Sequence, residues 1–385
     1  MKKKSTQKKD YAKLALALHK KLGGKIRTTP AQPVHNREDL STVYTPGVGA
    51  VSSYLAKNPG KAREYTMKGR TIAIVSDGSA VLGLGNIGPY GAIPVMEGKA
   101  VLFKSLADLE AFPIVLDTQD ADEIVETVIR IAPMFGGINL EDIAAPKCFD
   151  IEARVKAALD IPVMHDDQHG TAIVVVAGLI NAAKVVKKDL KKMKVVVSGA
   201  GAAGTAVANL LKLLGVGDIV MLDSKGIILR GRKDLTPHKK ELAAFTNKRQ
   251  IAGGLSEALE GADAVIGVSG PGLMNASHIK LMAKKPIVFG LANPVPEILP
   301  EEAVLGGAAV IATGRSDYPN QINNSLAFPG VFRGAIDNKV TKITDAMKLK
   351  AAKALAALVK KPTAAMIVPG TFDKRVVPSV AKAIR

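Results

Sequence analysis

The chain has 385 residues, of which 47% are hydrophobic, so it is long enough to bury the cores of two domains. Its formal net charge of +18 would suit a nucleic acid, a membrane surface or an acidic small molecule. Aromatic residues make up only 4% and tryptophan is absent, which leaves few platforms for stacking on bases. We therefore interpret the charge as a basic, solvated surface rather than as a nucleic-acid site.

The sequence pattern predicts a soluble protein of a reducing compartment. The longest apolar stretch, Thr171 to Val186, is interrupted by polar residues and falls short of the roughly 20 apolar residues that a membrane span needs. The lysines at the N-terminus resemble the start of a signal peptide, but the apolar run Leu14 to Leu18 is bounded by lysines and predicts an amphipathic helix. The single cysteine, Cys148, excludes an internal disulfide framework. We expect a cytoplasmic protein.

From Thr71 onward, short apolar runs alternate with longer stretches of helical period, which is typical of a parallel sheet with crossover helices. Asp120 to Met134 predicts a helix, because its apolar residues recur at helical spacing and acidic residues crowd its first turn. Ala346 to Leu358 predicts another. The expected strands are Thr71–Val75, Pro113–Leu116, Ile161–Met164, Lys194–Val197, Asp218–Leu222, Ala264–Val268, Pro286–Phe289 and Ala309–Ala312.

A glycine-rich loop of the GxGxxG type follows one of these strands and precedes a helix predicted over Thr205 to Leu214. In this context the first glycine permits a tight turn, the second lets the backbone approach a pyrophosphate, and the third lets helix and strand pack closely. The helix N-terminus adds amide donors for the phosphates. We predict dinucleotide binding by Gly199, Ala200, Gly201, Ala202, Ala203 and Gly204.

The choice between NAD and NADP stays open. Asp223 ends the next strand, at the offset where a carboxylate accepts hydrogen bonds from the adenosine ribose, and its charge disfavours a 2′-phosphate. Ser224 and Lys225 follow at once and could receive that phosphate. The loops after two later strands should line the same cleft, and we expect Asn293 in the second of them to contact the nicotinamide ribose or the substrate.

Two acidic pairs, Glu141-Asp142 and Asp166-Asp167, stand at the ends of apolar runs. Adjacent carboxylates repel one another, and several carboxylates without a thiolate suit Mg²⁺ or Mn²⁺ better than zinc. A solvated loop is the alternative for each pair taken alone. Tyr44, before a Pro-Gly turn, and Lys99, within an apolar stretch, are further outliers, because a lysine in such a stretch is costly unless it is functional or reaches solvent.

The order and content of these segments resemble the malic enzyme family, specifically its short prokaryotic members. The resemblance extends from about Thr28 to Ile336. The matching blocks are Tyr44-Thr-Pro-Gly-Val, Ser76-Asp-Gly-Ser-Ala-Val-Leu-Gly-Leu-Gly85-Asn-Ile-Gly88, Glu97-Gly-Lys-Ala-Val-Leu-Phe-Lys104, Leu140-Glu-Asp-Ile143, His165-Asp-Asp-Gln-His-Gly-Thr171 and Asn323-Asn-Ser-Leu-Ala-Phe-Pro329.

The resemblance implies a role for each matching residue. It makes Tyr44 the general acid and Lys99 the general base, with Asp166 supporting them. It implies that Glu141, Asp142 and Asp167 are the metal ligands, and that Asn293 and Asn323 lie near the nicotinamide ribose and the substrate carboxylates. It further implies cofactor contacts from the segment Ser76, Asp77, Gly78 and Ser79.

The activity implied is the oxidative decarboxylation of malate to pyruvate and carbon dioxide with reduction of NAD(P), by a homodimer that uses Mg²⁺ or Mn²⁺. The fold implied is α/β, with a malic-enzyme catalytic domain over residues 1–165, a Rossmann-type NAD(P)-binding domain over 166–325, and helices of 326–385 that return to the first domain. We expect neither the phosphotransacetylase-like extension of some bacterial members nor a counterpart of the substrate-binding arginine of the longer enzymes.

Two rival functions are compatible with parts of the sequence. The metal ligands, Tyr44 and Lys99 would suffice for an enzyme that decarboxylates oxaloacetate without net redox chemistry. A Rossmann domain could also act as a nucleotide sensor or bind nucleic acid, although the intact acid–base and metal residues argue against this second rival.

Overall fold

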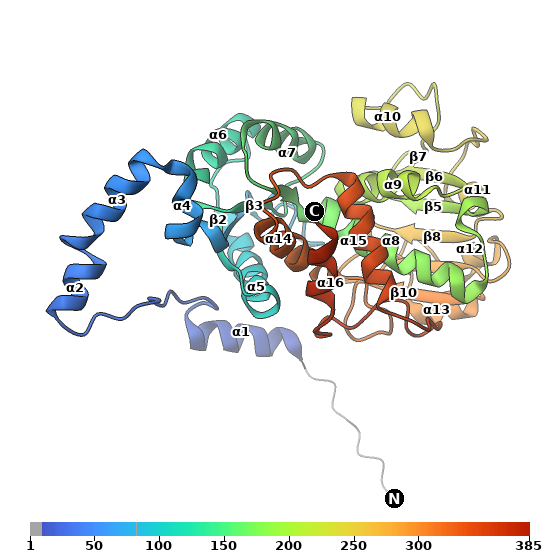
Figure 1. The fold of residues 1–385 in the computed structure, drawn as a ribbon. Helices are drawn as coiled ribbons and strands as arrows, with labels where there is room; N and C mark the ends of the chain where they lie inside the picture. Colours follow the sequence, from blue (N-terminus) through green and yellow to red (C-terminus); the bar gives the residue numbers. More distant parts are fainter. Residues whose placement is uncertain (1–9, 82) are drawn as a thin grey trace, which may run out of the picture.

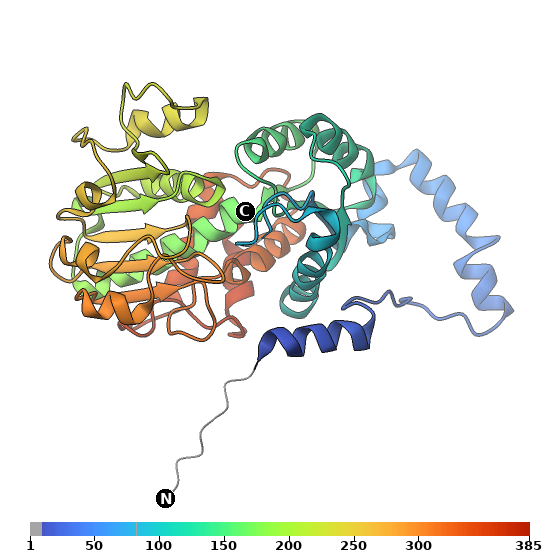
Figure 2. The same cartoon turned by 180° about the vertical axis from the view of Figure 1, so that it is seen from behind.

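In the computed structural model, which describes residues 10–81 and 83–385, a parallel sheet and a mostly parallel sheet lie side by side and are joined by long helices (Figures 1 and 2). The lysine-rich start of the chain lies outside the described residues. The N-terminal helices are α1 (Tyr11–Leu22), α2 (Arg37–Val43), α3 (Gly47–Lys57) and α4 (Ala62–Tyr65). The first of them confirms the predicted amphipathic helix.

The first sheet has the strand order β2-β1-β3-β4, and all of its pairs are parallel. Its core consists of apolar strand residues, such as Ile72 and Ile138, that are fully buried against the crossover helices. The strands are β1 (Thr71–Ser76), β2 (Glu110–Val115), β3 (Gly137–Leu140) and β4 (Val163–His165), and the helices between them are α5 (Gly88–Ala107), α6 (Ala121–Ile131) and α7 (Lys147–Ala158).

The second sheet has the order β10-β9-β8-β5-β6-β7, in which only β7 is antiparallel to its neighbour. Its strands are β5 (Lys194–Ser198), β6 (Asp218–Asp223), β7 (Gly226–Ile227), β8 (Ala264–Gly267), β9 (Ile287–Gly290) and β10 (Val310–Thr313). The helices of this part are α8 (Asp166–Val186), α9 (Ala202–Leu214), α10 (Pro237–Phe245), α11 (Leu255–Leu259), α12 (Ala276–Lys280) and α13 (Pro300–Leu305).

Helix α8 is long and apolar enough to cross a membrane, but 72% of its most apolar window is buried inside the protein. It packs against α9 on one side and against the C-terminal helix α15 (Asp345–Ala357) on another. The other C-terminal helices, α14 (Phe328–Asp337) and α16 (Val376–Ala383), pack against each other, and α14 also contacts α5 of the first half. The C-terminal helices therefore touch both halves of the chain, and the domain limits at residues 165 and 325 stay a prediction.

Each predicted strand is present with shifted ends, and the predicted helices correspond to α6, α9 and α15. Asp120 caps α6 by accepting hydrogen bonds from the amides of Asp122 and Glu123, the two acidic residues of its first turn. The two-residue strand β7 and the strand β3 were not predicted. This strand has only four residues, and one of them, Asn139, is a fully buried amide that interrupts the apolar run.

Candidate active site

A cleft of about 1110 Å³ is lined by loops from both sheets and collects many of the side chains predicted from the sequence. The first half of the chain contributes Lys99 from α5 and Glu141-Asp142 directly after β3. The second half contributes Asp167 from the first turn of α8 and the loops that follow β5, β8 and β9. These loops follow the carboxyl ends of parallel strands, where ligands bind in open α/β sheets.

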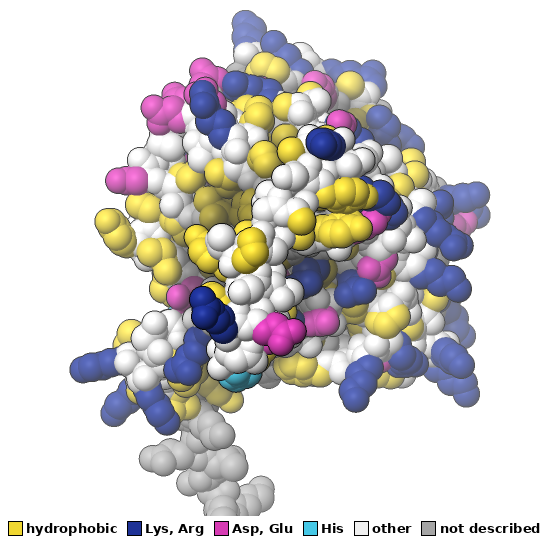
Figure 3. All heavy atoms as spheres, turned by 60° about the vertical axis from the view of Figure 1, so that its left-hand side comes forward, with side chains coloured by type: hydrophobic (Ala, Val, Ile, Leu, Met, Phe, Trp, Pro, Cys, Tyr) yellow, Lys and Arg dark blue, Asp and Glu magenta, His cyan; other side chains and the backbone are white. Residues whose placement is uncertain are grey.

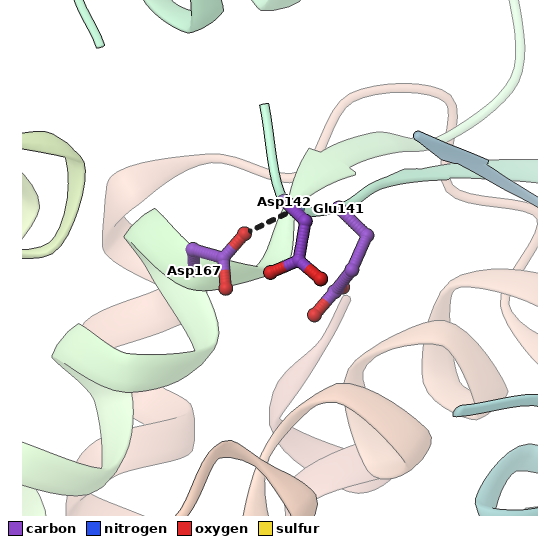
Figure 4. A group of neighbouring side chains, drawn as sticks. All are labelled: Glu141, Asp142 and Asp167. Carbon is purple, nitrogen blue, oxygen red and sulfur yellow. Dashed lines mark hydrogen bonds between the residues drawn. The ribbon is translucent and has the colours of Figure 1, made fainter. Parts of the chain in front are cut away.

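The carboxylates of Glu141, Asp142 and Asp167 point toward one another (Figure 4), and one oxygen from each lies within 4.8 Å of the others. Glu141 and Asp142 are buried, whereas the Asp167 side chain is 32% exposed on the cleft side. The backbone amide of Asp142 donates to Asp167 Oδ2 at 2.8 Å, which fixes α8 against the end of β3. Three converging carboxylates without a thiolate fit Mg²⁺ or Mn²⁺.

Lys99 is almost fully buried beside this acidic cluster. Its Nζ lies 2.6 Å from Asp166 Oδ2 and 2.7 Å from Glu141 Oε1, and 4.2 Å from the centre of the Phe328 ring. Burial lowers the pKa of Lys99, but the carboxylates of Asp166 and Glu141 outweigh burial and raise this pKa above its usual value. Burial also raises the pKa of Asp166, to about 7 against the opposing effect of Lys99. Lys99 can act as a base only if positive charge near these carboxylates lowers its pKa.

The glycine loop has the strand-turn-helix geometry that the sequence predicts. Gly199 has a φ of 118°, a value that L side chains rarely adopt, and Gly204 lies so close to the preceding turn that a Cβ there would be 1.8 Å from the carbonyl oxygen of Gly199. Helix α9 begins at Ala202, and Gly201 to Ala203 line the cleft. The amides of this helix N-terminus are therefore available to a phosphate.

The segment Ser76 to Ser79, for which the resemblance implies cofactor contacts, is buried beneath the cleft wall. Asp77 Oδ1 accepts hydrogen bonds from the amide and hydroxyl of Ser79, and the Ser79 hydroxyl accepts one from the amide of Ala144. Lys147 pairs with the other oxygen of Asp77. These contacts hold the loop that carries Glu141 and Asp142. The implied cofactor contacts stay a prediction.

Asn293 and Asn323 both line the cleft, and their proximity to substrate and nicotinamide stays a prediction. Sequence analysis missed Glu297, whose buried carboxylate accepts hydrogen bonds from the amides of Ser269 at 2.7 Å and Ala292 at 3.0 Å. This side chain ties together the loops after β8 and β9. The role of Glu297 could not be predicted from the sequence, because a single acidic residue between prolines is typical of an ordinary loop.

Sequence analysis also missed Lys25, which lines the cleft together with Lys99. Its Nζ donates to the carbonyl oxygen of Pro94 at 2.7 Å, and its amide donates to Glu97 Oε2 at 3.0 Å, so the residue is held against α5. Among the described residues that line the cleft, Lys25 and Lys99 are the two with a formal positive charge. The sequence could not reveal this, since Glu97 is 72 residues away along the chain.

Tyr44 does not reach the cleft of its own chain in the described structure. It follows α2, its side chain is 66% exposed, and it is not among the residues that line the cleft. Helices α2 and α3 lie at the outer edge of the molecule, on the side of the first sheet that faces away from the second (Figures 1 and 2). The structure therefore brings Lys99, Asp166 and the metal-site carboxylates together but leaves the predicted general acid apart from them.

A glycine loop and a carboxylate cluster line one cleft, and a buried lysine lies beside the carboxylates. These features define the class of metal-dependent oxidoreductases that use a dinucleotide. Comparison with known families narrows this class. Residues 23–156 match the family "Malic enzyme, N-terminal domain" and residues 168–383 match "Malic enzyme, NAD binding domain". The chain belongs to the malic enzyme family.

Individual relatives agree with this assignment. The chain is 54% identical to a bifunctional malic/malolactic enzyme of Bacillus subtilis, over 96% of this chain and 91% of the relative. It is 46% identical to an NADP-dependent malic enzyme of Halomonas elongata, over 94% and 85% of the two chains. The crystal structure of an NAD-dependent malic enzyme from Thermotoga maritima superimposes with a TM-score of 0.93 at 50% identity, covering 96% of this chain and 98% of that one.

Proposed function

We propose that this chain catalyses the oxidative decarboxylation of malate to pyruvate and carbon dioxide with reduction of NAD(P), as a soluble enzyme of the cytoplasm. The observation that carries the proposal is that one cleft is lined both by the glycine loop and by Lys99. The Nζ atom of this lysine contacts Asp166 and Glu141. The family and the names of the relatives point to the same reaction.

Each protein group has one task in the reaction. Lys99 accepts the proton of the C2 hydroxyl as hydride leaves C2 for the nicotinamide, and Asp166 orients the lysine through their ion pair. Loss of the C4 carboxylate from the resulting oxaloacetate gives enolpyruvate, and Tyr44 then protonates C3. Glu141, Asp142 and Asp167 would hold the divalent cation, which would polarise the C2 oxygen and would offset the carboxylate charge that keeps Lys99 protonated.

The first test is the appearance of reduced nicotinamide when the purified chain is given malate, Mn²⁺ and NAD⁺ or NADP⁺. We expect equal amounts of pyruvate and reduced cofactor. Decarboxylation of supplied oxaloacetate without any oxidation of malate would contradict the proposal and favour the redox-free rival. Salt-sensitive DNA binding at physiological ionic strength, with no turnover, would favour the nucleic-acid rival instead.

We assign the C4 carboxylate of malate to Lys25, because Lys99 is already engaged by two carboxylates and Lys25 is the other cation that lines the cleft. Lys25→Met keeps most of the stem and removes the charge. We expect KM for malate to rise about 10- to 100-fold, the range that corresponds to a charged hydrogen bond. Affinity for the dinucleotide should not change. Lys21→Met, at the exposed end of α1, is the matched control, and an unchanged KM in Lys25→Met would rule out the assignment.

We further propose that the enzyme is a homodimer in which a second copy brings Tyr44 to the cleft. Helices α1 to α4 contain no buried residue in the described structure. The face that carries them has apolar patches among scattered lysines and arginines (Figure 3). Large apolar side chains exposed in this part of the chain are Tyr11, Leu14, Leu16, Leu18, Leu22, Val34, Leu40, Val43, Val48, Val51, Tyr54 and Tyr65. So much exposed apolar surface supports an interface between copies.

A further inference from the structure

A buried network of side chains joins three helices beside the first turn of α8. Glu152, a buried residue of α7, accepts a hydrogen bond from the backbone amide of His165 at 2.9 Å through Oε1, and Lys156 pairs with the same oxygen. The other oxygen, Oε2, lies 2.9 Å from His169 Nε2. Across the imidazole ring, Lys348 Nζ from α15 lies 3.0 Å from His169 Nδ1. The network therefore ties α7 and α15 to one turn of α8.

The chemistry of these groups fixes the direction of the hydrogen bonds between them. A lysine ammonium has donors only, so Lys348 donates to His169 Nδ1. The Nε2 atom of the same ring then carries the hydrogen and donates to Glu152, because an ionised carboxylate has acceptors only. Asp345 accepts from Lys348 at 2.8 Å and ends the chain of contacts at the surface. The bridge between the three helices is thus fully paired from Glu152 to Asp345.

Glu152 occupies the place of a cap for α8. His165 is the N-cap residue of this helix, and its own side chain makes no capping hydrogen bond. In a capping box, a glutamate or glutamine at the third helical position accepts a hydrogen bond from the N-cap amide. The third residue of α8 is Gln168, but here the amide of His165 donates to Glu152 instead. A side chain from α7 therefore sets where α8 begins.

The turn that Glu152 caps carries two residues of the active site (Figure 4). Asp166 and Asp167 are the first two residues of α8. Asp166 pairs with Lys99 on α5, and Asp167 accepts from the backbone amide of Asp142 directly after β3. Both partners belong to the first half of the chain, as does Glu152. A shift of this turn would move both aspartates away from those partners.

We propose that Glu152 is a positioning residue for the divalent-cation site, and that it acts on Asp167 through the His165 amide and the His169 ring. Among the described residues that line the cleft, none belongs to the buried network, so the network can affect the site only through the turn that it holds. This inference rests on the proposed function, in which the carboxylate cluster that includes Asp167 holds a divalent cation.

The test measures Mn²⁺ binding to the purified chain by titration calorimetry, with 5′-AMP as a second probe that reports on the dinucleotide site. Glu152→Gln keeps the shape of the side chain, but it removes the charge and replaces one acceptor by a donor. We expect Mn²⁺ affinity to fall roughly 10- to 100-fold, as for loss of an outer-shell partner, and 5′-AMP affinity to stay unchanged. His169→Leu should have the same two results. Asp150→Asn, which removes an exposed charge from the same helix, should change neither affinity.

A double variant tests whether the two residues act through the same turn. Glu152→Gln combined with His169→Leu should bind Mn²⁺ about as weakly as the weaker-binding single variant, because groups in one hydrogen-bonded network are not additive. Losses that add in full would contradict the proposed connection between Glu152 and the ring.

Unchanged Mn²⁺ affinity in Glu152→Gln would overturn the inference. Loss of 5′-AMP binding together with Mn²⁺ binding in both single variants would also overturn it, because the network would then stabilise the fold as a whole. If only one of these variants keeps its 5′-AMP binding, its Mn²⁺ affinity decides. In all of these cases Mn²⁺ binding and malate oxidation by the wild-type chain leave the proposed function standing. Failure of the wild-type chain to bind Mn²⁺ would instead contradict the proposed metal site, and this inference with it.

Discussion

Mixing two inactive variants, Tyr44→Phe and Lys99→Ala, is expected to restore malate oxidation. Each variant alone should lose roughly 10²- to 10⁴-fold in activity, the usual contribution of a general acid or base. If Tyr44 serves the cleft of the other copy, a hybrid dimer contains one site with both lesions and one intact site. Hybrids that are purified away from the parent dimers should therefore show about half of the wild-type activity, since one of their two sites is intact.

The experiment needs hybrids to form, so the two variants carry different affinity tags, are unfolded and refolded together, and are purified through both tags. A mixture of Lys99→Ala with Asp167→Ala is the matched control, because these two residues line the same cleft of one chain and cannot complement each other. Hybrids of Tyr44→Phe and Lys99→Ala without recovered activity would show that Tyr44 acts within its own chain or has no part in the chemistry.

The role of Tyr44 in the reaction is tested separately from its location. Tyr44→Phe keeps the aromatic ring and removes the phenol, so oxaloacetate reduction should persist because this step needs Lys99 and the cofactor. Metal-dependent exchange of the pyruvate methyl protons with solvent should collapse, because it requires proton transfer at C3. Exchange at the wild-type rate would make Tyr44 a structural residue of the interface.

The second large effect is expected from Asp167→Asn, which keeps the shape of the side chain and its acceptor for the Asp142 amide but removes one charge from the cluster. Mn²⁺ affinity, measured by titration calorimetry, should fall by more than the roughly 10- to 100-fold typical for loss of an outer-shell partner. Malate oxidation should be nearly abolished at limiting Mn²⁺. Dinucleotide binding should survive, because the glycine loop follows β5 and contains none of the three carboxylates.

Asp160→Asn, an exposed residue outside the cleft, is the control for the loss of one acidic charge from the protein. Near-normal activity of Asp167→Asn at limiting Mn²⁺ would mean that Asp167 is not a ligand. The cation would then have to be held by Glu141 and Asp142 with some other group.

Local patterns were sufficient to predict a large part of the protein. The glycine loop could be predicted because strand, turn and helix are consecutive in the chain. Gly199 and Gly204 are required because a Cβ at either position would clash with nearby backbone atoms. The position of the acidic pairs could be predicted because each pair ends an apolar segment, which places it at a strand end or a helix start. Their role as metal ligands stays a prediction. The strand β3 was not predicted, because Asn139 makes a run of only four residues look polar. The amide is buried in the structure, where it donates a hydrogen bond to Glu141.

Contacts between distant segments were decided by the tertiary structure alone. Lys25 contacts Glu97, which is 72 residues away in the sequence, and Lys99 contacts Asp166, which is 67 residues away. No periodic sequence pattern predicts contacts over such separations. Asp223 has the position of a ribose acceptor in the sequence, but the fold brings Arg232 and Lys239 onto its oxygens, which neutralises its charge. Tyr44 matches a catalytic motif, yet its helix projects from the fold. Sequence thus determined which chemical groups are present, whereas packing between remote elements decided which charges are neutralised and which side chains stay exposed.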